Sequence, residues 1–250
     1  MSDANSRQRI SIVVPALNEE RLITPVVEGI LSHLVGRFAD YEVILINDGS
    51  VDATAEKMEA LAAAHDKVRV IHHQTHRGLG TSYKRGVQEA KFEYLMMLCG
   101  DGGLPPKSLP AIFDKIGEAD IVAPYMVNLQ RIKTPLRLFT SRCYTHLLNT
   151  LFNQNVHYYN GLPVHRTDLV RQVRISGSGF AFQGEVMTKL LRAGCSLVQV
   201  GVEGAEMAQR SSALKPRNLA SVFKTLLILI WDISRFDPSM IKRTGPGVES

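Results

Sequence analysis

The chain has 250 residues, 45% of them hydrophobic and 21% charged, with a formal net charge of +5 and a pI near 9.2. It contains no low-complexity tract or internal repeat, which excludes a disordered or fibrous chain and fits one large domain or one domain with an appendage. Three widely spaced cysteines without a CxxC pair disfavour a disulfide framework and a structural zinc site, and favour a reducing compartment. The positive charge favours an anionic partner without choosing among phosphate ligands, nucleic acid and membrane.

The first turn of the chain disfavours two common nucleotide-binding folds. Residues 10–14 are a β-branched run that predicts a strand, and residues 22–34 have the apolar period of a helix. The turn between them contains no glycine, but holds Pro15, Asn18 and two carboxylates that begin at Glu19. A dinucleotide-binding unit needs GxGxxG here, and a P-loop needs backbone N–H groups and a lysine. Capping of the helix by Asn18 is the local explanation of its position, and it does not exclude a ligand contact.

Polar residues also follow the second predicted strand, at residues 43–46. The next helix is expected at residues 53–65, and a serine and an aspartate before it are good N-cap residues. Capping does not explain the consecutive carboxamide and carboxylate of Asn47 and Asp48 at the end of the strand. Such a pair can exchange hydrogen bonds with the edge of a nucleobase.

Three further strands continue the alternation, at residues 68–72, 94–98 and 121–123. A helix that ends near residue 90 lies between the first two of these strands. Strands that alternate with helices at these intervals predict an α/β fold with a mostly parallel, doubly wound central sheet and helices on both faces.

The strand at residues 94–98 ends abruptly in a glycine-rich bend that precedes Pro105 and Pro106. This bend carries Asp101 to the carboxyl edge of the sheet, where open α/β sheets bind ligands. Turn formation is the purely local explanation of an aspartate among glycines. We expect Asp101 to have a function beyond the turn.

Four motifs in this order, between residues 11 and 106, resemble the family 2 glycosyltransferases of the GT-A fold. They are SIVVPALNEE (11–20), NDGSVDAT (47–54), HRGLGTSYKRG (76–86) and the strand-end Asp101. The resemblance implies a nucleotide-diphospho-sugar donor, with its base and ribose near the first two motifs and its diphosphate beside Asp101. By the same resemblance, donor contacts are expected at Pro15, Ala16, Asn18, Glu19, Asn47, Asp48, Gly78, Ser82, Arg85, Gly100 and Asp101.

The metal motif of that family, Asp-x-Asp, falls on Cys99-Gly100-Asp101, so a cysteine replaces its first aspartate. Mg²⁺ and Mn²⁺ prefer oxygen ligands, and one carboxylate with diphosphate oxygens and waters can still hold either ion. Cys99 would be a poor ligand for Mg²⁺ and a weak one for Mn²⁺. We therefore expect Mg²⁺ or Mn²⁺ bound through Asp101, with weakened or metal-optional binding as the alternative.

The second half of the chain carries the information on the acceptor. Residues 126–175 contain seven Arg or Lys residues and one acid, Asp168. A solvated basic face explains such a bias, and so does binding of a phosphorylated acceptor or of the leaving diphosphate. The segments that resemble dolichol- and polyprenol-phosphate sugar synthases are a helix from 141 to about 153, residues 159–166, residues 179–185, a strand at 197–202 and a shortened signature at 210–215. Acceptor or diphosphate contacts are expected at Arg131, Arg142, Gln183, Arg210 and Lys215.

The chemistry expected is inverting sugar transfer to a lipid phosphate such as polyprenyl or dolichyl phosphate. Such an acceptor is already anionic and needs no general base, whereas a hydroxyl acceptor of a glycolipid or polysaccharide would need a carboxylate within hydrogen-bond reach. Asp101 and Glu185 are the expected catalytic residues, with Glu185 as the candidate base, although a helix-surface glutamate explains Glu185 equally well. A non-catalytic sugar-nucleotide-binding subunit is a second alternative. A nucleotidyltransferase is disfavoured because no glycine-rich basic loop follows the first strand.

We expect one catalytic domain at residues 1–215, with a nucleotide-binding half (8–125) and an acceptor-side half (126–215), then an amphipathic helix and tail at 216–250. The apolar run within residues 218–236 is far shorter than the roughly 20 residues that span a bilayer. The segment is either a core-packing helix or an interfacial helix with Trp231 at headgroup level, and we expect an amphipathic helix that packs on the domain and contacts the membrane. The polar N-terminus has no signal-peptide core, so we expect a cytoplasmic protein. We also expect it to be peripheral on the cytoplasmic face of the membrane and to bind no nucleic acid.

Overall fold

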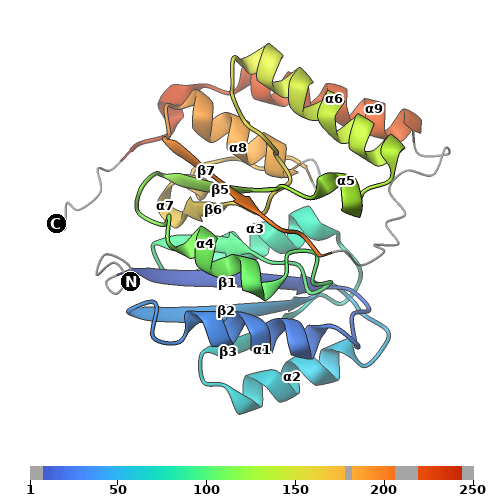
Figure 1. Cartoon of the computed structure of the whole chain (residues 1–250), viewed down its shortest axis with the longest axis vertical. Coiled ribbons are helices and arrows are strands. Elements are labelled where there is room, and N and C mark those ends of the chain that lie inside the picture. The colour runs from blue at the N-terminus through green and yellow to red at the C-terminus, as the bar shows by residue number, and fades with distance from the viewer. Residues whose placement is uncertain (1–7, 178–181, 206–218, 244–250) are drawn as a thin grey trace.

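A seven-stranded sheet in the order β3-β2-β1-β4-β6-β5-β7 forms the centre of the computed structural model, which describes residues 8–177, 182–205 and 219–243 (Figure 1). Neighbouring strands are parallel except where β6 pairs antiparallel with β4 and β5. This mostly parallel α/β sheet confirms the predicted fold class. The strands are β1 (Arg9–Ala16), β2 (Asp40–Asn47), β3 (Val68–His72), β4 (Tyr94–Met97), β5 (Ile121–Met126), β6 (Val164–Arg166) and β7 (Leu197–Val202).

Helices cover both faces of the sheet. The helices are α1 (Ile23–Leu34), α2 (Thr54–Ala64), α3 (Leu79–Glu89), α4 (Leu109–Phe113), α5 (Leu129–Ile132), α6 (Pro135–Phe152), α7 (Thr167–Val170), α8 (Phe182–Arg192) and α9 (Leu219–Arg235), with short 3₁₀ turns η2 (Pro106–Ser108) and η5 (Pro238–Met240). Helices α1, α2 and α4 pack together on one face. On the other face α3 meets α8 through the rings of Tyr83 and Phe182, whose centroids are 4.8 Å apart. Helices α6 and α9 both pack on α8 (Figure 1).

The core explains why the central strands read as unbroken apolar runs. Residues 12–14 of β1 and 43–46 of β2 are fully buried, as expected for parallel strands covered by helices on both faces. Gly86 lets α3 approach β1 closely, because a Cβ atom there would lie 2.5 Å from the side chain of Val13. The strand ends are thereby held at fixed positions relative to α3.

The short helices α4, α5 and α7 were not predicted, and three longer or central elements also differ from the sequence prediction. Helix α6 begins at Pro135 rather than near residue 141, since proline is well suited to the first turn of a helix. Strand β6 was not predicted, and its three residues are too few to show an alternating pattern. Helix α8 was not predicted either, whereas α9 falls within the expected range of 218–236. Among the described residues, no helix is both long enough and apolar enough to cross a bilayer.

Candidate active site

The carboxyl ends of β1, β2 and β4 lie at one edge of the sheet and are tied to one another. The Asp48 N–H donates to the Ala16 carbonyl at 3.0 Å, and the Gly100 N–H donates to the Pro15 carbonyl at 3.0 Å. Because these three strands are parallel neighbours, the residues that follow them meet at the same edge. The structure therefore brings together most of the residues predicted to contact a donor.

Asn18 links the turn after β1 to the turn after β2. Its backbone is left-handed, with φ of 56°, a conformation that asparagine tolerates well. Its Oδ1 accepts from the Val51 N–H at 2.9 Å, and its own N–H donates to the Ser50 hydroxyl at 3.0 Å. Helix α1 begins only at Ile23 and makes no side-chain cap, so the capping explanation of Asn18 is wrong. Asn18 instead fixes the shape of the site edge.

The carboxylate of Asp48 organises the loop that joins β3 to α3. One oxygen accepts from His73 Nδ1 at 2.8 Å and from the Arg77 N–H at 3.0 Å. The other accepts from His76 Nδ1 at 2.8 Å and from the Gly78 N–H at 2.9 Å. Burial raises the pKa of Asp48, but these hydrogen bonds outweigh it and hold the pKa below its usual range. Asp48 is therefore ionised and its lone pairs are engaged by the loop.

Sequence reasoning missed His73 and His76. Both lie just beyond β3, which pairs with β2 so that His72 is opposite Asn47. This pairing puts the residues after β3 beside Asp48. The order of the strands in the sheet indicates that these histidines lie beside Asp48, whereas their residue types alone do not.

Two carboxylates, those of Glu19 and Asp101, lie close to Cys99 beyond the end of β4, and Asp52 lies close to Glu19. Desolvation by burial, and then the negative charges of Asp101 and Asp52, raise the pKa of Glu19. Desolvation, and then the charges of Asp101 and Glu19, raise the pKa of Cys99, so its sulfur is a neutral thiol. Asp101 also accepts from the Gly103 N–H at 3.0 Å, which means that the turn explanation of this aspartate holds alongside any function.

The carboxylate cluster fits a divalent cation only in part. Over residues 8–177, 182–205 and 219–243, no three His, Cys, Asp or Glu side chains are placed to hold a metal ion together. Asp101 and Glu19 supply the hard oxygen atoms that Mg²⁺ or Mn²⁺ prefers, whereas the Cys99 thiol does not. The remaining ligands would have to come from the diphosphate of a bound donor and from water.

The residues of the third motif (76–86) do not all lie at the candidate site. Gly78 has φ of 89° and precedes α3, and its N–H reaches Asp48. Ser82 is fully buried one turn into the helix, with no partner for its hydroxyl. Arg85 pairs with Glu89 at 2.8 Å, further along the helix from the site edge. The structure thus places Gly78 at the edge and turns Arg85 toward Glu89.

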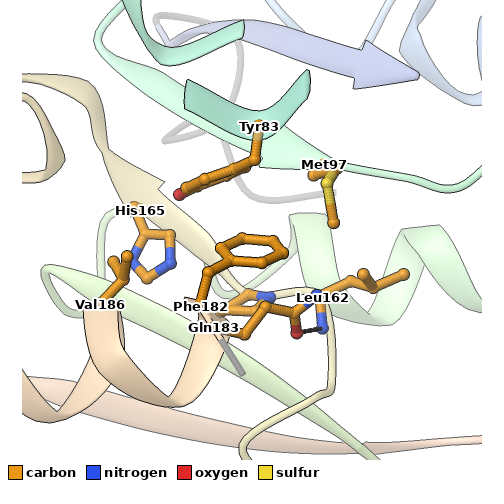
Figure 2. Close-up of a pocket in the computed structure, with 8 residues that line it drawn as sticks. Tyr83, Met97, Leu162, His165, Phe182, Gln183 and Val186 are labelled. Atoms are coloured by element: carbon orange, nitrogen blue, oxygen red, sulfur yellow. Dashed lines mark hydrogen bonds between the residues drawn. The ribbon is translucent and has the colours of Figure 1, made fainter. Parts of the chain in front are cut away.

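A small cavity of about 10 Å³ lies among α3, β4, β6 and α8 (Figure 2). Gln183 lines it, and its amide oxygen accepts from the Leu162 N–H at 3.4 Å. The Tyr83 hydroxyl points toward the ring of His165, and both Tyr83 Oη and His165 Nδ1 are buried without a partner (Figure 2). Burial lowers the pKa of His165 to about 3, so this imidazole is neutral.

Glu185 lies in a buried network rather than on a helix surface, so the surface explanation is wrong. It is 1% exposed and accepts from the N–H groups of Ser176 at 2.7 Å and Gly177 at 3.0 Å, and from Lys189 Nζ at 2.8 Å. Its part as a general base stays a prediction. Of the other acceptor-side candidates, Arg131 and Arg142 are exposed, while Arg210 and Lys215 lie outside the described residues.

A seven-stranded sheet with carboxylates gathered at the end of its fourth strand has the architecture of GT-A glycosyltransferases. The crystal structure of glucosyl-3-phosphoglycerate synthase from Mycobacterium tuberculosis, in complex with Mn²⁺, UDP and phosphoglyceric acid, matches 98% of this chain and 83% of its own, with a TM-score of 0.69 and 18% identity. The same synthase in complex with Mg²⁺ and UDP matches with a TM-score of 0.68 and 16% identity, over 98% of this chain and 84% of its own. At these identities the match supports the fold.

The model of glycosyl transferase family 2 matches residues 11–165, and the chain belongs to this family. The dodecaprenyl-phosphate galacturonate synthase of Rhizobium johnstonii is 26% identical over 69% of this chain and 52% of its own length. The dolichol-phosphate mannosyltransferase of Saccharomyces cerevisiae is 32% identical over 42% of this chain and 40% of its own. The undecaprenyl-phosphate mannosyltransferase of Micrococcus luteus is 25% identical over 79% and 84%. The chain thus spans about half the length of the first two, and the expected likeness to polyprenol-phosphate sugar synthases is confirmed.

Proposed function

We propose that the protein is an inverting glycosyltransferase that moves a sugar from a UDP- or GDP-sugar to a lipid phosphate such as polyprenyl or dolichyl phosphate. The observation that carries the proposal is the set of tied strand ends, which gathers Asn18, Glu19 and Asp101 at one edge. Relatives named for transfer to dodecaprenyl, dolichol and undecaprenyl phosphate support this class of acceptor.

Different residues at this edge of the sheet hold different parts of the donor. Asp48 fixes the loop at residues 73–78, and the base and ribose bind between this loop and the turn at Asn18. Asp101 lies beside the diphosphate. A Mg²⁺ or Mn²⁺ ion, held by Asp101 and the diphosphate oxygens, would neutralise the charge of the leaving group. The structural relatives bound to these ions and UDP support this part of the proposal.

A phosphate acceptor fits the state of Glu185. The phosphate oxygen that attacks the anomeric carbon is already anionic, so no carboxylate has to remove a proton. Both oxygens of Glu185 already accept hydrogen bonds inside the protein. The acceptor is a membrane lipid, so we place the protein as a peripheral protein at the cytoplasmic face of a membrane.

The test is release of nucleoside diphosphate from a panel of UDP- and GDP-sugars, with and without polyprenyl phosphate, in Mg²⁺, Mn²⁺ or chelator. Release that requires the lipid phosphate supports the proposal and identifies the donor. Release that requires a hydroxyl acceptor instead, or donor binding without turnover under every condition, would overturn it.

Asp101→Asn is the first variant to measure in this assay. We expect turnover to fall by roughly 10² to 10³, because the charge beside the diphosphate is lost. Asp66→Asn is the matched control, since Asp66 is exposed and precedes β3 at the opposite, amino edge of the sheet. Equal activity of both variants and the unaltered protein would contradict the assigned role of Asp101.

A further inference from the structure

Helices α6 and α9 expose most of the large apolar side chains found on the described surface. On α6, Leu136, Phe139 and Leu151 are 62%, 66% and 49% exposed. On α9, Leu227, Ile228 and Trp231 are 53%, 53% and 60% exposed. These six residues, the α6–α9 surface, make up more than half of the exposed large hydrophobic residues in the described part of the chain.

The two helices are held next to each other by α8. Arg192 near the end of α8 donates to the Ile233 carbonyl of α9, and its guanidinium lies 5.7 Å from the ring centroid of Phe152 at the end of α6. Both helices run in the same direction and begin on the side of the molecule where β1 and β2 end (Figure 1). The α6–α9 surface therefore begins on the side of the molecule that carries the candidate donor site.

In the part of α9 whose side chains the structure describes, residues 226–235, folding accounts for one side only. Leu229 and Ile233 are 5% and 0% exposed, and Asp232 between them pairs with Lys189 of α8. Leu227 and Ile228 lie on the opposite side of the helix, and Trp231 lies one turn after them on that same side. A surface helix normally places charged or polar residues there, so an apolar outer side indicates contact with something other than water.

The charges around the surface indicate what that contact is. Helix α6 contains no Asp or Glu, and the one acid of α9, Asp232, is paired with Lys189. Arg142 is exposed on α6, and the guanidinium of Arg235 stacks 3.8 Å from the ring centroid of Trp231. Cations and an indole beside an apolar strip match anionic headgroups above lipid chains. A second copy of the surface would instead oppose these cations with its own.

We propose that the α6–α9 surface lies on an anionic lipid membrane, with its apolar residues among the lipid chains and its arginines at the headgroups. The contact expected from the sequence for residues 218–236 becomes a two-helix surface, to which α6 contributes Leu136 and Phe139. This inference deepens the peripheral membrane location of the proposed function, because it names the surface that makes the contact and the charge of the lipid, and it holds for any sugar.

The test measures vesicle binding by the full chain, without turnover. Cosedimentation with phosphatidylcholine vesicles and with mixed phosphatidylcholine–phosphatidylglycerol vesicles is compared at low and high salt. We expect binding to the anionic vesicles about tenfold tighter or more, weakened by salt, with a blue shift of Trp231 emission. No binding to any vesicle, or salt-resistant binding without preference for anionic lipid, would overturn the proposal.

The double variant Phe139→Ser/Ile228→Ser keeps Trp231 as the reporter and removes exposed side chains only. We expect at least a tenfold loss of vesicle binding with an unchanged Tm. Val35→Ser is the matched control, because Val35 is 67% exposed at the end of α1, away from both helices. Equal binding by the double variant and the unaltered protein would overturn the proposal. So would a concentration-dependent dimer that the double variant abolishes without vesicles.

The two proposals fail separately. Sugar transfer to a detergent-solubilised acceptor, by a protein that binds no vesicle, would overturn the membrane surface and leave the proposed function standing. Vesicle binding without turnover on any donor would do the reverse.

Discussion

Gly49 shows how tightly the end of β2 is fitted against the loop that Asp48 organises. Its φ is 79°, and a Cβ atom there would lie 2.6 Å from the backbone nitrogen of His76. Gly36 has a similar φ of 72°, but a Cβ atom there would meet nothing within 4 Å. The two glycines therefore separate the cost of a left-handed backbone from the cost of a steric clash.

Gly49→Ala and Gly36→Ala form a matched pair. We expect Gly36→Ala to lower the free energy of unfolding by about 1 kcal/mol, the strain of a positive φ. Gly49→Ala should lower it further and weaken donor binding, because the loop bonded to Asp48 has to move. Urea unfolding and titration with nucleoside diphosphate measure both effects. Equal losses of stability, with donor affinity retained, would mean that this loop is not part of the site.

The carboxyl ends of parallel strands lie at one edge of a sheet, and this fact predicted the positions of some site residues but not of others. It predicted that Asn18, Asp48 and Asp101 would share an edge, because parallel neighbours end together. It could not predict that Asp48 would be engaged by His73, since this contact depends on which strand lies beside β2. The environment of Glu185 also escaped it, because the partners of this carboxylate come from a loop and from the next turn of its own helix.

At the level of elements, Lys189 joins α8 to α9 and to the chain before α8. Its ammonium is 2% exposed and bonds Glu185, Asp232 and the Arg174 carbonyl. Burial raises the pKa of Asp232, but the hydrogen bond and charge of Lys189 outweigh it and lower the pKa. This buried charge is thus one of the attachments of α9, beside the Arg192 hydrogen bond and the buried Leu229 and Ile233.

Lys189→Met should destabilise the protein by about 3–5 kcal/mol, because it leaves the buried carboxylate of Glu185 and the half-buried carboxylate of Asp232 without their cation. Lys115→Met is the control, since the Lys115 side chain is 43% exposed and pairs with Glu118 at 2.9 Å, and it should cost about 1 kcal/mol or less. Chemical unfolding of both variants provides the comparison. A loss for Lys189→Met no larger than that of the control would show that hydrophobic packing alone holds α9.

His165 in β6 predicts a dependence of stability on pH. Its pKa is about 3 in the folded protein and about 6.5 in an unfolded chain, so the unfolded state binds more protons between these values. Stability should therefore fall as the pH drops from about 6.5 toward 3, by up to about 1.4 kcal/mol per pH unit. Unfolding by urea from pH 7.5 downward, for the unaltered protein and His165→Gln, isolates this contribution. Parallel curves for the two proteins would contradict it.

Strand β6 and helix α8 could not be predicted from an apolar pattern, each for its own physical reason. Strand β6 contributes three residues and is positioned by pairing with β4 and β5, which are distant in the sequence. Helix α8 buries Glu185 and Lys189, so its inner face does not read as apolar. The strands β1 and β2 were predictable because burial on both faces made them continuous apolar runs.

At the level of the whole molecule, the two predicted halves share one sheet. Strands β6 and β7 come from the acceptor-side half and pair with β4 and β5 of the nucleotide-binding half. We propose that residues 8–177, 182–205 and 219–243 unfold as one cooperative unit that includes α9.

The one tryptophan of the chain, Trp231 on α9, tests this directly. Its emission and the far-ultraviolet circular dichroism should report the same midpoint in urea, as expected for a two-state transition. A fluorescence transition at lower urea would mean that α9 detaches before the sheet unfolds. Lys189→Met is the informative variant, because loss of the α8–α9 ion pair should separate the two midpoints.

The place of β6 in the sheet also imposes an order on synthesis. Strand β4 leaves the ribosome long before residues 164–166, which complete its second edge. At about 5–20 residues per second, that edge waits roughly 3 to 13 s for its partner. Strand β5 likewise remains unpaired until β6 is synthesised, and its other edge remains unpaired until β7 is synthesised. An unpaired edge is a template for pairing with other chains, so the nascent protein is most vulnerable to aggregation in this interval. The three residues of β6 end the interval for β4, and β7 ends it for β5.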